Sequence, residues 1–249
     1  MRIAEHIAAL DEEGVRLAEA ADRAGMDALA PTCPGWQVRD LLRHVGGIHR
    51  WAMAHVITGR RQPFSTREEA EFFVAVDDDE LLDRYRESHR ALVDTLAAAD
   101  ESVECWTFLP APSPLAFWAR RQAHETAVHR ADAESAVSTV PYWDPSFAAD
   151  GIEELLSGFF GRPGGRLVAD PPLSMALVPT DIDAGWTFHI EPAGRRLVAG
   201  EMPAQLTIVG TASELYLLLW NRSGTERLDL RGDAAVLDLW RTRATITWN

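Results

Sequence analysis

The spacing of the apolar residues changes near residue 140, and this change limits the chain to a fold built in two parts. Before it, apolar residues recur every three or four positions in several long stretches, as on one face of a helix. After it, short stretches rich in β-branched and aromatic residues resemble strands. We therefore predict two domains, at 1–140 and 147–249, with a linker around Pro141–Pro145.

The first domain is predicted to be a bundle of four helices. The helical spacing covers residues 3–24, a second stretch that begins near Val38, residues 77–98, and residues 115–136. The second stretch carries His44, His49 and His55, and residues 60–66 interrupt the pattern after it. Helices joined by short connections form bundles.

The second domain is predicted to be a small α+β fold. It opens with a helical stretch at 147–160, and a second helical run is expected at 212–220. Strand-like pieces lie at 173–178, 185–190, 196–198 and 204–209. A short segment at 228–231 and a last helix near 234–241 complete the domain, which has the usual size of a small domain.

Charge and composition exclude several classes of function. The chain has 24 basic and 38 acidic residues, a net charge of −14, whereas nucleic-acid binding requires a concentrated basic face. It has no run of about 18 apolar residues, and its first residues lack the basic-then-apolar pattern expected of a secretion signal. Its two cysteines, Cys33 and Cys105, lack metal-site spacing and are expected to be reduced. We expect a cytoplasmic protein that binds neither nucleic acid nor a membrane.

Three residues are candidate metal ligands. Glu125 and His129 lie four positions apart, so a helix projects both from one face. His44 lies on the inward stripe of the second helix, whereas His49 is about 140° round that helix and should point elsewhere. Two imidazoles and one carboxylate would leave a position open for substrate, as in catalytic zinc sites. The spacing alone is equally compatible with a solvated Glu–His pair and a core histidine.

Three motifs resemble the mycothiol-dependent maleylpyruvate isomerase family. The segment 32–45 (TCPGWQVRDLLRHV) is similar to the opening motif of that family, and 125–132 (ETAVHRAD) is similar to its metal-ligand helix. The segment 212–222 (ASELYLLLWNR), followed by 231–233 (RGD), is similar to its C-terminal domain. The resemblance thus extends over nearly the whole chain.

The resemblance implies a DinB-like four-helix bundle followed by a sterol-carrier-like α+β domain. It implies that His44, Glu125 and His129 bind a divalent metal, with zinc favoured, and that mycothiol is the thiol cosubstrate. It also implies that Arg222 binds the acidic substrate or the thiol, although Asn221 stands where the family commonly has glycine. The implied activity is isomerisation or transfer on a small electrophilic acid of the maleylpyruvate type, by a monomer.

Two other functions are compatible with the same sequence. The sterol-carrier-like ending fits a non-catalytic small-molecule carrier, and the open metal position fits a hydrolase that uses a zinc-bound water. Among neighbouring residues, we expect Trp36, Trp51, Trp118 and Cys33 to serve packing. Asp132 is a candidate to orient His129, but a residue in that position more often faces water.

Overall fold

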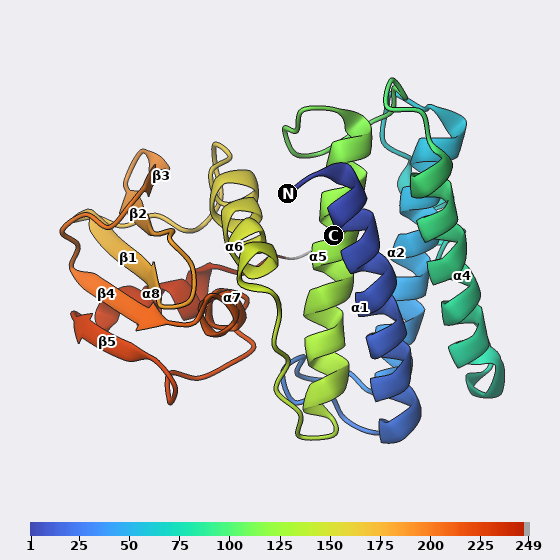
Figure 1. Cartoon of the computed structure of the whole chain (residues 1–249), viewed down its shortest axis with the longest axis horizontal. Coiled ribbons are helices and arrows are strands. Elements are labelled where there is room, and N and C mark those ends of the chain that lie inside the picture. The colour runs from blue at the N-terminus through green and yellow to red at the C-terminus, as the bar shows by residue number, and fades with distance from the viewer. Residues whose placement is uncertain (247–249) are drawn as a thin grey trace. The chain divides into compact units, whose positions relative to one another are not determined.

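A computed structural model describes residues 1–246 of the chain (Figure 1). The chain forms two compact units, Met1–Pro141 and Tyr142–Asn249. The first is helical and the second contains a sheet with helices. The predicted fold class, a helical bundle followed by an α+β domain, is confirmed. No helix in the described part of the chain is both long enough and apolar enough to cross a membrane.

The first unit is a bundle of long helices. Its elements are α1 (Ile3–Ala24), α2 (Val38–Thr58), α3 (Thr66–Ala70), α4 (Asp78–Ala98) and α5 (Pro114–Ser135). Helix α1 packs against α5 and α4, and α2 packs against α4 and α5. The α2–α5 contact matters most for function, because these two helices carry the candidate ligands.

Local signals in the sequence fix where these helices begin. The backbone N–H of Gln37 donates to the Asp40 carboxylate at 2.9 Å, which caps the start of α2. The Ser113 hydroxyl accepts from the Ala116 N–H at 3.1 Å, and Pro114 occupies the first turn of α5. A fixed start sets the rotation of each helix, and therefore which side chains face the neighbouring helix.

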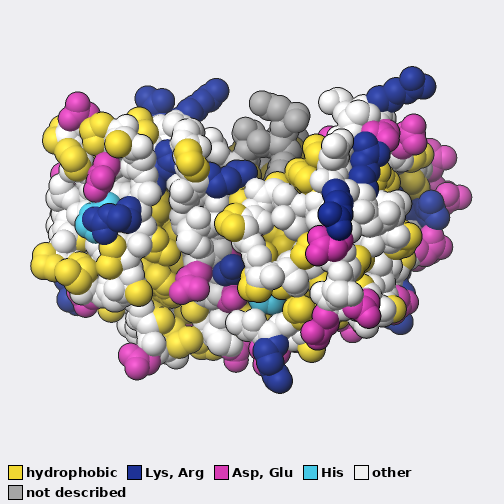
Figure 2. Space-filling view, turned by 90° about the horizontal axis from the view of Figure 1, so that it is seen from above, with side chains coloured by type: hydrophobic (Ala, Val, Ile, Leu, Met, Phe, Trp, Pro, Cys, Tyr) yellow, Lys and Arg dark blue, Asp and Glu magenta, His cyan; other side chains and the backbone are white. Residues whose placement is uncertain are grey.

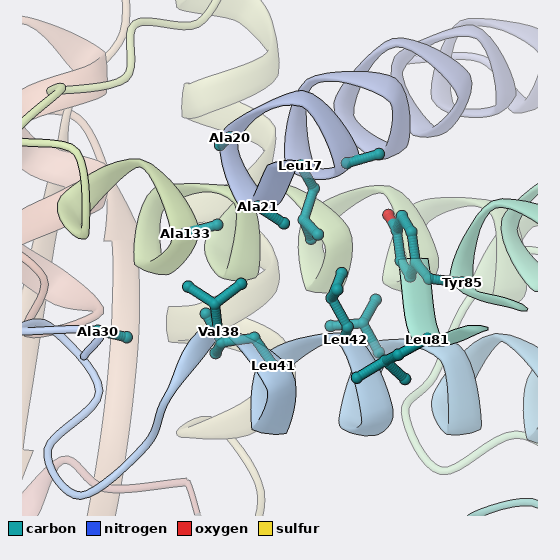
Figure 3. Packing of buried hydrophobic residues seen from close by; sticks show 12 residues of the cluster. Leu17, Ala20, Ala21, Ala30, Val38, Leu41, Leu42, Leu81, Tyr85 and Ala133 are labelled. Atoms are coloured by element: carbon teal, nitrogen blue, oxygen red, sulfur yellow. The ribbon is translucent and has the colours of Figure 1, made fainter. Parts of the chain in front are cut away.

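Buried leucines and small residues fill the space between α1, α2, α4 and α5. Figure 3 shows Leu17 of α1 opposite Leu42 of α2, with Tyr85 of α4 beside them. Leu41 and Val45 of α2 are fully buried, and each such side chain contributes roughly 1.5–3 kcal/mol by leaving water. This packing holds the face of α2 from which His44 projects.

The second unit is built on a mixed sheet. Helix α6 (Pro145–Glu153) and the π-helical turn η1 (Glu154–Phe159) come before it. The strands are β1 (Leu173–Pro179), β2 (Trp186–Glu191), β3 (Gly194–Ala199), β4 (Leu206–Gly210) and β5 (Asp229–Gly232). Their order in the described residues is β3-β2-β1-β4-β5, with β1 and β4 parallel and the other neighbours antiparallel.

Helices α7 (Ala212–Leu219) and α8 (Ala235–Arg243) complete this unit. Trp240 of α8 is fully buried and lies edge-on to Phe188 of β2, with ring centroids 5.9 Å apart. Its indole N–H donates to the carbonyl of Leu219 at 3.0 Å. Trp240 therefore ties α8 to the end of α7, just before Arg222.

The structure corrects some predicted boundaries. The short helix α3, which was not predicted, begins at Thr66, where the interrupted stretch ends, and Ser65 caps it by accepting from the Glu68 N–H. The helical opening expected at 147–160 begins at Pro145, inside the expected linker, because Asp144 caps it. Figure 2 shows acidic and basic side chains scattered over the face in view, in keeping with the mixed charge pattern of the sequence.

Candidate metal centre

His44, Glu125 and His129 meet at one point of the helical unit. Each offers a ligand atom, and these three atoms lie within 4.8 Å of one another. The Nε2 atom of His44 is 3.3 Å from Oε1 of Glu125, and Nε2 of His129 is 3.4 Å from the same oxygen. Two imidazole nitrogens and one carboxylate oxygen form a donor set that suits zinc and other divalent transition metals.

The helical period explains why these residues come together. Glu125 and His129 are one turn apart on α5, and His44 projects from the part of α2 that packs against α5. His49 lies outside this group of ligand atoms, but it does not point away from the bundle: it is fully buried, and its Nε2 lies 2.9 Å from the hydroxyl of Thr126, which is also on α5. Thus the histidines of α2 are divided between the candidate site and the core.

The three candidate ligands are largely, but not fully, buried. The side chains of Glu125 and His129 are 10% and 11% exposed, whereas that of His44 is 20% exposed. His44 is thus the most exposed of the three candidate ligands. Burial of a carboxylate is costly unless charged or hydrogen-bonding groups compensate it, so the partners of Glu125 determine whether the site is stable.

Two of the three candidate ligands make hydrogen bonds with buried charged side chains. Nδ1 of His129 lies 2.9 Å from Oδ2 of Asp132, and the Thr32 hydroxyl donates to the other Asp132 oxygen at 2.6 Å. Arg121, one turn before Glu125 on α5, donates to Oε2 of Glu125 at 3.1 Å. The expectation that Asp132 faces water is wrong, because its side chain is fully buried between α5 and the Thr32 loop.

These contacts set the charges of the site. Burial alone would raise the pKa of Glu125, but hydrogen bonds with His129 and His44 and the charge of Arg121 hold that pKa well below its ordinary value. Burial would lower the pKa of His129, but Asp132 and Glu125 raise it to about 9. The carboxylate is thus ionised at neutral pH, and a metal ion would displace a proton from His129 on binding.

Aromatic rings flank His44. The Trp36 ring centroid lies 5.2 Å from that of His44 and 6.3 Å from that of His129, with the latter two rings parallel. The Phe73 ring lies 6.3 Å from His44 on the loop between α3 and α4. Phe73 packs over Gly47, where any side chain would collide with its ring. The Trp36 ring thus borders the candidate site and also packs against the bundle core.

The other two tryptophans near these motifs serve packing, as expected. Trp51 and Trp118 are buried and surround His55 rather than the candidate ligands. Cys33 packs at the edge of the bundle core, and neither Cys33 nor Cys105 forms a disulfide.

Two sequence profiles match the chain. The profile described as the mycothiol maleylpyruvate isomerase N-terminal domain matches residues 7–134, which contain all three candidate ligands. The profile described as the MDMPI C-terminal domain matches residues 146–239. The chain belongs to the mycothiol-dependent maleylpyruvate isomerase family. Both parts of the family architecture are present, in the order that the motifs predict.

Solved structures agree with this assignment at the level of fold. A crystal structure described as mycothiol-dependent maleylpyruvate isomerase, and one of a histidine-to-alanine mutant of it, each match with a TM-score of 0.63. Each match covers 92% of this chain and 93% of the matched chain, at 12% sequence identity. A search of curated proteins finds no match. The maleylpyruvate isomerase family thus accounts for the fold, while the specific reaction must be argued from the residues.

The structure also places the family's candidate arginine. Arg222 follows α7 in the second unit, and its Nη1 donates to the carbonyl of Trp220 at 2.9 Å. Asn221, which stands where the family commonly has glycine, has a φ of 57°. This is the left-handed conformation that glycine adopts freely and asparagine tolerates better than most residues. The substitution therefore preserves the turn before Arg222.

Four residues of the site were not singled out from the sequence: Thr32, Gly47, Phe73 and Arg121. Two of them had a signal, because Thr32 begins the first family motif and Arg121 lies four positions before Glu125 on the same helix. The contribution of Gly47 and Phe73 depends on how distant segments pack.

Proposed function

We propose that this chain is a metal-dependent enzyme that uses mycothiol to isomerise, or to add the thiol to, a small electrophilic acid of the maleylpyruvate type. The observation that carries the proposal is the convergence of two imidazole nitrogens and one carboxylate oxygen within 4.8 Å in a sheltered site. Membership of the maleylpyruvate isomerase family supports the choice of thiol and of substrate class.

The bound ion is proposed to be zinc. Two histidines and one glutamate are a common ligand set of catalytic zinc, and three protein ligands leave a position for substrate or cosubstrate. When bound, the ion would hold the sulfur of mycothiol and favour its thiolate form at neutral pH. The ionised Glu125 and the Asp132–His129 pair fit such an ion, because ligands must be deprotonated and oriented before they bind.

The thiolate is then the nucleophile. It adds to the double bond of a cis unsaturated acid, forming a carbon–sulfur bond, while the π electrons move onto the adjacent carbonyl. The former double bond is now single and can rotate. Expulsion of the thiolate returns the trans isomer with no net change in protons. If the carbon instead takes a proton, the product is a thioether and the reaction is a transfer.

Arg222 is proposed to recognise the carboxylate of the substrate, or to bind mycothiol. The guanidinium presents donors in a planar fork that matches a carboxylate. The preserved turn at Asn221 supports a defined position for this side chain in the second unit. Arg222 would thus supply substrate binding, separate from the ligand set of the metal.

A turnover assay tests the proposal against its alternatives. Purified protein is incubated with mycothiol and a panel of maleyl-type acids, and both thiol consumption and cis–trans conversion are followed. We expect turnover that requires mycothiol and stops on removal of the metal by a chelator. Turnover without thiol would favour a zinc-dependent hydrolase, and ligand retention without turnover would favour a carrier.

Matched histidine variants connect turnover to the site. His44→Gln removes a proposed ligand, whereas His49→Gln changes a buried histidine five residues further along α2 and keeps a hydrogen-bonding group toward Thr126. We expect loss of both metal and turnover in the first variant and retention of both in the second. Equal activity of the two variants would overturn the proposal.

A further inference from the structure

The two carboxylate oxygens of Glu125 have different partners. Oε1 faces the histidines, at 3.3 Å from Nε2 of His44 and 3.4 Å from Nε2 of His129. Oε2 accepts a hydrogen bond from Nη2 of Arg121 at 3.1 Å. One oxygen therefore faces the candidate metal position and the other faces a buried cation.

Arg121 is unusual for its burial. It is 1% exposed, although arginine is seldom buried without an ionic partner. It lies one turn before Glu125 on α5, so both side chains project from the same face of a rigid helix. A buried arginine–carboxylate pair resists rotation, because leaving either charge without its partner in the interior is strongly destabilising.

A carboxylate can bind a metal through one oxygen or through both. If both oxygens of Glu125 bound, the second would fill the position that substrate or thiol must use. We infer that Arg121 is a positioning residue that keeps Glu125 a one-oxygen ligand, and so keeps a coordination position open. This inference rests on the proposed function, since it requires the three residues to bind a metal.

The two supporting charges then have opposite effects. Asp132 accepts from the ring of His129 and makes that ligand more basic. Arg121 draws electron density from the carboxylate and makes Glu125 a weaker donor. If a metal is bound, Arg121 would thus make the ion more electrophilic, and Asp132 would oppose this effect.

Cobalt substitution gives a readout that does not depend on turnover. Full-length protein loaded with one equivalent of Co²⁺ is measured by visible absorption, since four-coordinate Co²⁺ absorbs more strongly than five- or six-coordinate Co²⁺. A small thiol, β-mercaptoethanol, is then added to probe the open position through the sulfur-to-metal charge-transfer band. We expect strong visible bands and a clear charge-transfer band in the wild type.

Arg121→Met removes the cation but keeps an unbranched side chain of similar length. We expect it to bind Co²⁺ and to show visible bands that are weaker by about twofold or more, because Oε2 turns toward the ion. The charge-transfer band of the added thiol should also be weaker. Arg121→Gln, which keeps a polar group, should show the same weakening of the cobalt bands. It replaces Arg121→Met in the test if the methionine variant does not fold. Arg121→Lys retains the charge and should keep the wild-type spectrum.

Arg130→Met is the control for loss of a buried arginine. Arg130 lies on the same helix, is 4% exposed, and pairs with Glu13 and Glu134 rather than with Glu125. Its loss should lower stability without changing the cobalt spectrum. A wild-type spectrum in metal-loaded Arg121→Met or Arg121→Gln would overturn the inference alone, whereas failure of the wild type to bind Co²⁺ would overturn the proposed function as well.

Discussion

The Nδ1 atom of His129 lies 2.9 Å from a carboxylate oxygen of Asp132, whose side chain is fully buried. This contact leaves Nε2 facing Glu125 and the candidate metal position. Replacing Asp132 with asparagine keeps the shape but removes the negative charge. We expect Asp132→Asn to weaken zinc affinity about 10- to 100-fold, as is usual for loss of a group that orients a ligating histidine. Competition with a chromophoric chelator measures this change.

Thr32→Val is the control for that variant. It removes the hydroxyl that donates to Asp132 at 2.6 Å but leaves the carboxylate in place. Its effect on affinity should be smaller than that of Asp132→Asn. Equal zinc affinity of Asp132→Asn and the wild type would show that the carboxylate does not support the site.

Two helical glycines should respond differently to alanine, which by itself stabilises a helix interior by about 1 kcal/mol. At Gly14 an added Cβ would lie 2.1 Å from Nε2 of His89, a buried ring held by a hydrogen bond to the Leu10 carbonyl. At Gly47 it would lie 2.3 Å from the ring of Phe73, which is 42% exposed and can move outward.

Urea denaturation of the two variants checks this difference. Gly14→Ala should lower the free energy of unfolding by about 2–3 kcal/mol, because the buried ring has nowhere to move. Gly47→Ala should stay within about 1 kcal/mol of the wild type, since helix propensity offsets the displacement of Phe73. A larger loss at Gly47 than at Gly14 would contradict the packing described for these helices.

His55 should make the fold sensitive to acid. Its ring is fully buried, lies 4.5 Å from Phe64 and 5.0 Å from Trp106 between centroids, and has no hydrogen-bond partner among residues 1–246. Burial, with a contribution from the charge of Arg60, lowers the pKa of His55 to about 4. In the unfolded chain the same group titrates near its ordinary pKa of about 6.5.

The sign of the pH dependence follows from these two values. Between the unfolded and folded pKa values of His55, the unfolded state binds a proton that the folded state does not, so stability falls as the pH is lowered. The slope is at most about 1.4 kcal/mol per pH unit for one group. His55→Phe should give a shallower fall in urea midpoint on acidification, with a residual slope from His49 and His89, whose pKa values burial also lowers. If the urea midpoint of His55→Phe falls with pH as steeply as that of the wild type, His55 is not a source of the acid sensitivity.

Substitution of Arg222 should affect substrate binding but not metal binding. Arg222→Gln removes a proposed charged pair with the substrate carboxylate, worth about 1.5–3 kcal/mol, so kcat/KM should fall about 10- to 100-fold. Arg222→Lys should lower kcat/KM by a smaller factor, because lysine keeps the charge but lacks the planar fork. Arg231→Gln, an exposed arginine paired with Asp229, is the control. A loss of bound zinc in Arg222→Gln would contradict the assigned role.

The sequence contains enough local information to predict the helices and part of the site. Helical spacing alone places Glu125 and His129 on one face. The inward stripe of α2 does not separate His44 from His49, because His49 is fully buried and contacts Thr126 of α5. Family motifs then join residues that lie far apart in the chain. The burial of Asp132 could not be predicted in this way, because it depends on how the Thr32 loop packs against α5. The ring of Phe73 reaches His44 only because Gly47 leaves room for it.

Anomalous diffraction from crystals grown with one equivalent of zinc tests the central claim most directly. Data collected on both sides of the zinc absorption edge locate the ion without assumptions about its ligands. We predict one strong peak about 2.0–2.2 Å from Nε2 of His44, Nε2 of His129 and Oε1 of Glu125. A zinc peak elsewhere, or no peak between these three atoms, would contradict the assignment of this site as the metal centre.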